Sequence, residues 1–129
     1  MSAELGLDGA TIKKLMQIGG SEFVTQMIDL FMSYVPQKLA EARSAVQAGD
    51  LVGVAKAVHP IKSSAANIGA HSMHDLAERI EQLARDQRGE SISHLLFELE
   101  GGYQQVQVQL RHQRNELTSE RRSLPHDSK

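Results

Sequence analysis

Long segments of helix-forming residues, separated by short glycine-containing breaks, are the feature that most restricts the fold of this chain. Apolar residues recur within the segments at the three- and four-residue spacing of amphipathic helices. Strand-like alternation persists only over 106–110, where it also fits a continuing helix. The pattern therefore predicts an all-α protein. The glycine breaks are Gly19-Gly20, Gly49, Gly69, Gly89 and Gly101-Gly102.

The breaks also predict where each helix begins and ends. Asp8 and Asp50 precede apolar-periodic segments, as N-cap residues do, and a glycine commonly follows the last turn of a helix. Ser21 can cap the second helix in the same way. The expected helices cover 9–18, 21–48, 51–68, 71–88 and 91–117.

Apolar residues of the second and third helices define their expected core faces. In the second helix Pro36 should produce a kink near Met32, because proline has no amide hydrogen to donate to the carbonyl of Met32. The core face expected for the second helix is Phe23, Met27, Leu30, Phe31, Tyr34, Leu39, Ala42 and Val46. The face expected for the third is Leu51, Val54, Val58, Ile61, Ala65 and Ile68.

Four long amphipathic helices joined by very short connections predict an antiparallel up-down-up-down four-helix bundle. The short first helix should cap one end, and the bundle should span 1–117. The remaining 118–129 are polar and contain Pro125, so we expect a frayed tail there.

Composition excludes several functional classes. The 129 residues contain no cysteine, which rules out a disulfide framework, a thiolate metal site and a thiol nucleophile. The net charge of −2 argues against nucleic-acid binding, which a basic excess normally accompanies. Neither a signal peptide nor an apolar run long enough for a membrane span is visible, so we expect a cytoplasmic protein.

The segment 58–69 is not explained by bundle packing alone. On a helical wheel His59 lies well away from the apolar stripe of its helix, so its imidazole should face solvent. Ala55, Lys62, Ser63 and Ala66 lie on the same face, one or two turns away. The sequence therefore predicts an exposed imidazole surrounded by small side chains and one cation.

This combination suits phosphoryl transfer. A histidine is largely neutral at cytoplasmic pH, and the lone pair of one ring nitrogen can attack phosphorus. Lys62 can reach phosphoryl oxygens across one turn, and the small neighbours leave room for a second protein. Pro60 should bend the helix at the histidine, which either tilts the imidazole outward or only adjusts packing.

The segment His59-x-Ile61-Lys62-Ser63-Ser64-Ala65-Ala66-Asn67-Ile68-Gly69-Ala70 resembles the signature of histidine-containing phosphotransfer (HPt) domains of bacterial multistep phosphorelays. Around it, Gly19-Gly20-Ser21-Glu22-Phe23, Gly49-Asp50 and Leu76-Ala77-x-x-Ile80-Glu81 are also family-like, and the resemblance covers roughly 10–110. It implies a four-helix bundle that accepts a phosphoryl group from a receiver-domain aspartate and passes it to another receiver domain.

The resemblance assigns a role to each site residue. His59 corresponds to the phosphorylated residue and Lys62 to the lysine that assists near the phosphoryl group. Glu81 stands where family members place a polar residue facing the histidine, and could orient the imidazole. Ser63 replaces a frequent glycine. We expect Ala55, Ser63 and Ala66 to belong to the docking face, with Lys62 exposed among them.

Motifs for nucleotide binding are missing, so no autonomous kinase activity is expected. The resemblance implies that Mg²⁺ would come from the partner, with no cofactor of the chain's own. The implied partners are receiver domains of response regulators and hybrid sensor histidine kinases, and the implied state is a monomer.

Three other interpretations stay open. A helical adaptor could bind signalling partners without being phosphorylated. His71 and His74, three residues apart, could place two metal ligands on one helical face, although no third ligand is evident. Nucleic acid could bind to Arg111, Arg114, Arg121 and Arg122, which a solvated helix end explains equally well.

Overall fold

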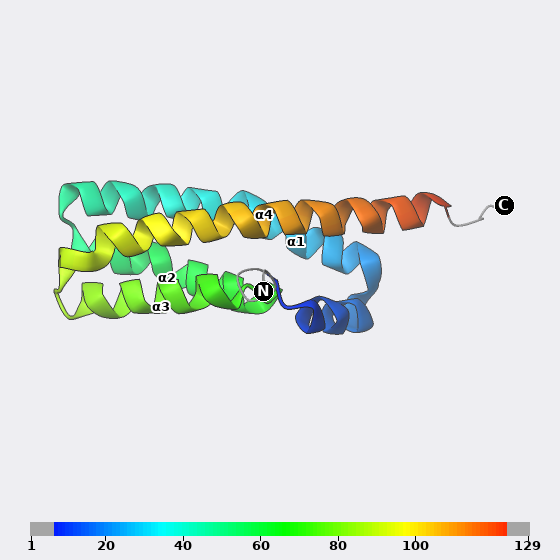
Figure 1. The fold of residues 1–129 in the computed structure, drawn as a ribbon, viewed down its shortest axis with the longest axis horizontal. Coiled ribbons are helices and arrows are strands. Elements are labelled where there is room, and N and C mark those ends of the chain that lie inside the picture. Colours follow the sequence, from blue (N-terminus) through cyan, green and yellow to red (C-terminus); the bar gives the residue numbers. More distant parts are fainter. Residues whose placement is uncertain (1–6, 124–129) are drawn as a thin grey trace.

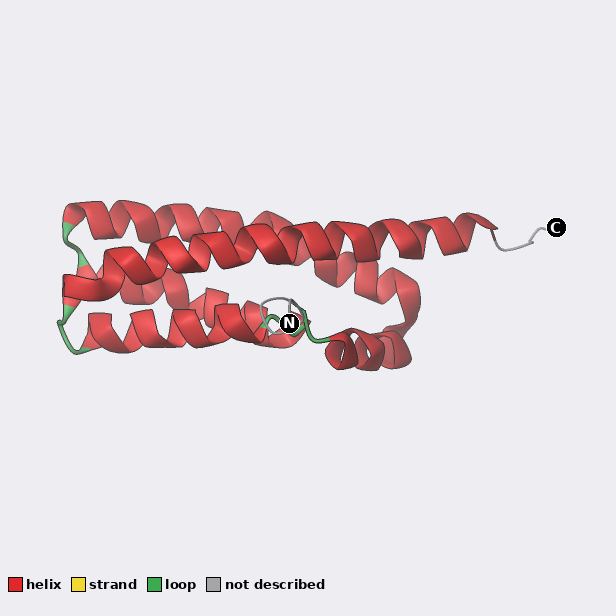
Figure 2. Cartoon of the chain, in the orientation of Figure 1, coloured by secondary structure: helices red, strands yellow, loops and turns green. Residues whose placement is uncertain are grey.

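A computed structural model shows four helices in an antiparallel bundle (Figure 1). The structure describes residues 7–123, and side chains as far as Ser119. The helices are α1 (Gly9–Ala48), α2 (Leu51–Ile68), α3 (His71–Arg85) and α4 (Ile92–Ser123), with a 3₁₀ turn η2 (Gly89–Ser91) before α4. Figure 2 shows helices joined by short loops and no strand in the described part of the chain. The predicted fold class is therefore confirmed.

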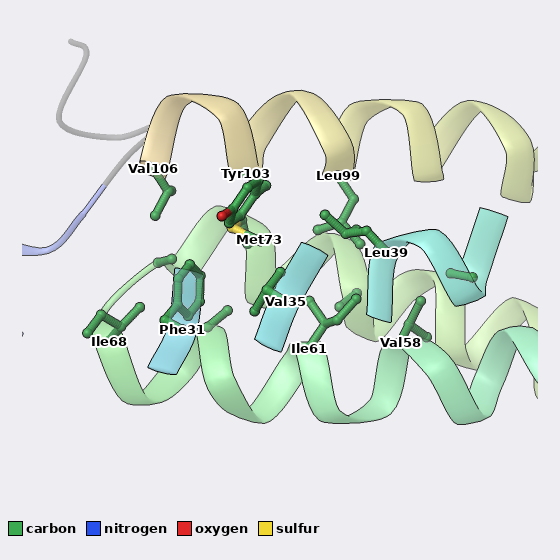
Figure 3. Packing of buried hydrophobic residues seen from close by; sticks show 14 of the residues in the cluster. Phe31, Val35, Leu39, Val58, Ile61, Ile68, Met73, Leu99, Tyr103 and Val106 are labelled. Atoms are coloured by element: carbon green, nitrogen blue, oxygen red, sulfur yellow. The ribbon is translucent and has the colours of Figure 1, made fainter. Parts of the chain in front are cut away.

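The bundle closes in a ring, in which α1 packs on α2, α2 on α3, α3 on α4, and α4 on α1. The interior is apolar throughout. Figure 3 shows Phe31, Val35 and Leu39 of α1 and Leu99, Tyr103 and Val106 of α4 in this interior, with Ile61 and Ile68 of α2. No helix within residues 7–123 is long and apolar enough to cross a membrane.

The first helix and its successor form one element, α1, with a break at Gly20. This glycine has φ 80° and ψ −176°, a backbone conformation that only glycine adopts readily. The break redirects the N-terminal part of α1, which lies beyond the ends of α2 and α3 (Figure 1). Asp8 caps this part, accepting a hydrogen bond from the amide of Ala10, and its own amide donates to the carbonyl of Gly69. The predicted end cap is thus present.

Pro36 leaves the carbonyl of Met32 without its helical donor, as expected. The hydroxyl of Tyr103 on α4 donates to this carbonyl at 3.3 Å. The Tyr103 ring also packs on Phe31, with ring centroids 6.0 Å apart. A backbone group freed by proline is therefore satisfied from a neighbouring helix.

Two expectations about the core faces and helix ends are wrong. On α1, Leu30 and Tyr34 are exposed, and Val24, Ile28 and Val35 are buried in their place. The core face predicted for the third helix is largely confirmed, since all its members except half-buried Leu51 are buried on α2. α3 ends at Arg85 instead of residue 88, because Gln87 adopts a left-handed conformation with φ 59°.

The predicted end of the last helix at residue 117 is also wrong. Helix α4 continues through Ser123, because no glycine or proline interrupts it before Pro125. Leu117 is still buried against the bundle, so the helix remains anchored where the tail was expected to begin. Residues 124–129 of the expected tail lie outside the described residues.

Candidate functional site

His59 lies on the outer face of α2, and its side chain is 57% exposed. The apolar stripe of α2 is turned inward, and the imidazole projects from the opposite side, as the wheel predicted. The backbone of α2 stays helical through Pro60. Ser63 and Ala66 are exposed near His59 as expected. Ala55 is not, because it is only 6% exposed, so it offers little surface to a partner.

Glu81 of α3 is the buried charge of this site. Its side chain is only 5% exposed, and Oε2 lies 2.9 Å from Nδ1 of His59. The same oxygen accepts hydrogen bonds from Nε and Nη2 of Arg85 at 3.2 Å and 2.6 Å. The other oxygen, Oε1, forms an ion pair with Nζ of Lys62 at 2.9 Å. One carboxylate thus connects the histidine with two cations.

The charge of Glu81 determines the tautomer of His59. Burial raises the pKa of this carboxyl, but hydrogen bonds from Arg85, Lys62 and His59 outweigh burial and lower the pKa to about 2. Glu81 is therefore ionised at neutral pH and can only accept hydrogen bonds. Nδ1 of His59 must carry the hydrogen, which leaves the lone pair on Nε2. Among the side chains that the structure describes, up to Ser119, Nε2 has no hydrogen-bond partner.

Lys62 is less exposed than the sequence suggested. Its side chain is 26% exposed, because the ammonium group turns toward α3 and pairs with Glu81. The expectation of an exposed lysine is therefore wrong, since the buried carboxylate needs a counter-charge. Lys62 therefore contributes to the packing of α2 on α3 as well as to the surroundings of the imidazole.

Arg85 is the residue that sequence analysis missed. It follows Glu81 by four residues, a spacing at which opposite charges on a helix meet. Its guanidinium is 57% exposed and shares Oε2 with the imidazole. The i,i+4 spacing is a signal that could have placed Arg85 at the site once Glu81 was assigned to it.

The other histidines do not form the site considered for a metal. His71 pairs with Asp8 at 3.0 Å, and His74 lies 3.1 Å from Asp75. The potential ligand group found among the described residues is His74, Asp75 and Glu78, on the surface of α3, and it does not include His71. Arg114, considered for nucleic acid, pairs with Asp29 of α1 at 2.6 Å.

A groove lies between α1 and the part of α2 that follows His59. It has a volume of about 280 Å³, and its lining combines an apolar wall from α1 with polar groups from α2. Leu30 and Tyr34, expected in the core, form part of this wall. The lining residues are Met27, Leu30, Phe31, Tyr34, Ser64, Asn67 and Ile68.

Comparisons with known proteins give the family and the fold of the chain. The family model described as the Hpt domain matches residues 26–109. Among solved structures, the histidine-containing phosphotransfer protein B (HptB) of Pseudomonas aeruginosa PAO1 superimposes with a TM-score of 0.81 at 22% identity. The match covers 85% of this chain and 95% of that one. A search of curated proteins gives no match.

Proposed function

Because this chain belongs to the Hpt domain family and so has a histidine phosphotransfer role in phosphorelays, we propose that His59 is the residue that carries the phosphoryl group. The observation that carries the proposal is the pairing of an exposed imidazole with a buried, ionised carboxylate. Glu81 holds the hydrogen on Nδ1 and directs the lone pair of Nε2 toward solvent. That nitrogen can be reached by the active site of another protein.

The transfer is a displacement at phosphorus. The lone pair of His59 Nε2 forms a nitrogen–phosphorus bond, and the bond between phosphorus and the aspartate oxygen of the receiver breaks. The aspartate leaves as a carboxylate with the electron pair of that bond. Nδ1 keeps its hydrogen, so the phosphorylated ring carries a positive charge, which Glu81 balances at 2.9 Å. The reverse reaction delivers the group to a second receiver domain.

The two cations around Glu81, Lys62 and Arg85, have different roles in this proposal. Lys62 is three residues from His59, and its flexible chain can exchange Glu81 for an oxygen of the incoming phosphoryl group. Arg85 makes two hydrogen bonds to Glu81 and keeps the carboxylate compensated during this exchange. Mg²⁺ held by the receiver would stabilise further charge on the phosphoryl oxygens, and this chain would supply no cofactor of its own.

Receiver domains of response regulators and hybrid sensor kinases are the partners in this proposal. The groove between α1 and α2 lies beside the histidine helix and offers apolar area with polar groups at its edge, as protein interfaces do. Ser63 and Ala66 add exposed small side chains next to His59. The proposal includes a monomer, because a monomer leaves this face uncovered. It also places the protein in the cytoplasm.

Labelling with a phosphorylated receiver domain tests the assignment. The wild-type chain should acquire a label that is labile in acid and stable in alkali, and His59→Gln should acquire none. His94→Gln is the matched control, because His94 is an exposed histidine of α4 that also pairs with a glutamate. A label that persists on His59→Gln would refute the site. A receiver that binds the wild-type chain without labelling it would support the non-phosphorylated adaptor instead.

A further inference from the structure

A second hollow lies on the N-terminal side of His59 along α2, whereas the α2 residues of the groove lie on its C-terminal side. It has a volume of about 580 Å³ and lies between the beginning of α2 and the end of α3. Arg85 belongs both to its lining and to the group around Glu81, so the hollow is continuous with the site. Its lining residues are Gly49, Asp50, Leu51, Val52, Ala55, Lys56, Ala84, Arg85 and Gln87.

Val52 is an apolar residue that lines this hollow and is exposed to solvent. Its side chain is 67% exposed, although valine is normally buried. Val52 precedes His59 by seven residues, so the two share a face of α2 and lie about 10 Å apart along its axis. A protein interface of common size covers about 800 Å² on each partner, a patch roughly 30 Å across. An interface centred on His59 therefore covers Val52.

Gln87 forms the opposite rim of the hollow, and its conformation is costly. It is the position after the α3 C-cap, and among the described residues it is the one non-glycine residue with positive φ, at 59°. Its amide donates to Ala84, and the next amide, of Arg88, donates to Leu83. Glycine is favoured in this position, as at Gly49 and Gly69. The side chain retained at Gln87 is exposed and therefore contributes no packing to the core.

The charge of the hollow favours an anionic occupant. Lys56 and Arg85 are both exposed along it. Lys62 and Arg85 both form ion pairs with the carboxylate of Glu81. The carboxylate of Asp50 is engaged in capping α2 through the amide of Gly53. A phosphorylated aspartate on a receiver domain is anionic, so its charge is complementary to this surface.

We propose that this hollow is a second contact surface for the receiver domain, in which Val52 and Gln87 determine which receivers bind productively. The inference rests on the proposed function, because the occupant is the protein that exchanges a phosphoryl group with His59. The α1–α2 groove and this hollow then hold the receiver on both sides of the imidazole.

A pair of matched valines tests the proposal. Val52→Asp places a charge in the hollow, and Val108→Asp places the same charge on α4, where the valine is 65% exposed. Both variants should fold, since Val52 lies in the first turn of α2, where a negative charge is favourable. Val52→Ser repeats the test without a charge. The measurement is the rate of phosphoryl transfer to His59 as a function of receiver concentration.

Val52→Asp should raise the half-saturating receiver concentration about tenfold, because it places a negative charge opposite an anionic partner surface, and Val108→Asp should raise it by less than about twofold. The limiting rate at saturation should stay unchanged, because Val52 does not touch the imidazole. Gln87→Gly should raise the half-saturating concentration about threefold while keeping the loop conformation. Equal behaviour of the two valine variants, or a fall in the limiting rate alone, would overturn the proposal. An unlabelled wild-type chain would instead refute the proposed function, and this inference with it.

Discussion

Replacing Glu81 with glutamine removes the negative charge that holds Lys62, Arg85 and His59 together. The pKa of the carboxyl is lowered from 4.5 to about 2, which corresponds to about 3 kcal/mol in favour of the ionised form in the folded protein. Arg85 and His59 are each 57% exposed, and water screens part of this interaction. We therefore expect Glu81→Gln to lower the free energy of unfolding by about 2 kcal/mol at pH 7.

The pH dependence gives the sign of the effect. A carboxyl whose pKa is lower in the folded state stabilises the protein above its unfolded pKa, here 4.5. That stability is lost as the pH falls from 4.5 toward about 2, because the folded protein must then bind a proton at Glu81. The difference between wild type and Glu81→Gln should therefore shrink over this range.

Urea unfolding followed by circular dichroism measures the difference at pH 7, at pH 4.5 and close to pH 2. Glu78→Gln is the control, because Glu78 is an exposed glutamate one turn away on α3. The control should be nearly neutral at each pH. Equal stability of wild type and Glu81→Gln at pH 7, or a difference that does not change on acidification, would refute the electrostatic account of this site.

Three further substitutions test other parts of the structure. Lys62→Ala should lower the free energy of unfolding by about 1 to 2 kcal/mol and slow phosphoryl transfer, whereas exposed Lys13→Ala should do neither; an unchanged stability would show that the ion pair with Glu81 contributes nothing. Gln87→Gly should raise the free energy of unfolding by about 0.5 kcal/mol, measured by urea titration, because glycine relieves the left-handed backbone; a loss of stability would contradict this. Tyr103→Phe should cost about 1 kcal/mol by the same assay, since the carbonyl of Met32 loses its donor, and Tyr34→Phe at the surface should cost nothing measurable.

Helix ends show how far the local sequence determines the fold. Gly49 and Gly69 end α1 and α2 with positive φ, and both were predictable because glycine adopts this conformation at little cost. Gln87 ends α3 with the same pair of hydrogen bonds, but glutamine carries no signal for a left-handed residue. The prediction therefore extended α3 to the next glycine, Gly89. A turn imposed by the packing of two helices is not visible in the residue that makes it.

The site shows a similar division. Helical spacing was enough to place His59 on the outer face of α2, because one helix determines that orientation. The environment of Lys62 depends on a contact between two helices, and the sequence pattern of α2 alone predicted a solvated side chain. The resemblance to the family predicted that Glu81 faces the histidine. The structure adds that this glutamate is buried and also binds Arg85. Burial of a charge is a tertiary property, so it appears only once α3 is packed on α2.

Leu30 and Tyr34 explain why apolar periodicity predicted a core face on α1 that is too wide. Hydrophobic residues at helical spacing are expected inside a bundle, yet these two are exposed at 66% and 38% along the groove beside the histidine helix. Positions in an interface and positions in the core both favour apolar side chains, so the sequence pattern does not distinguish them. On α1, the buried positions belong to Val24, Ile28 and Val35 instead. Leu30 and Tyr34 therefore have no role in the core. The error in the predicted core therefore falls where the proposed interface with the receiver lies.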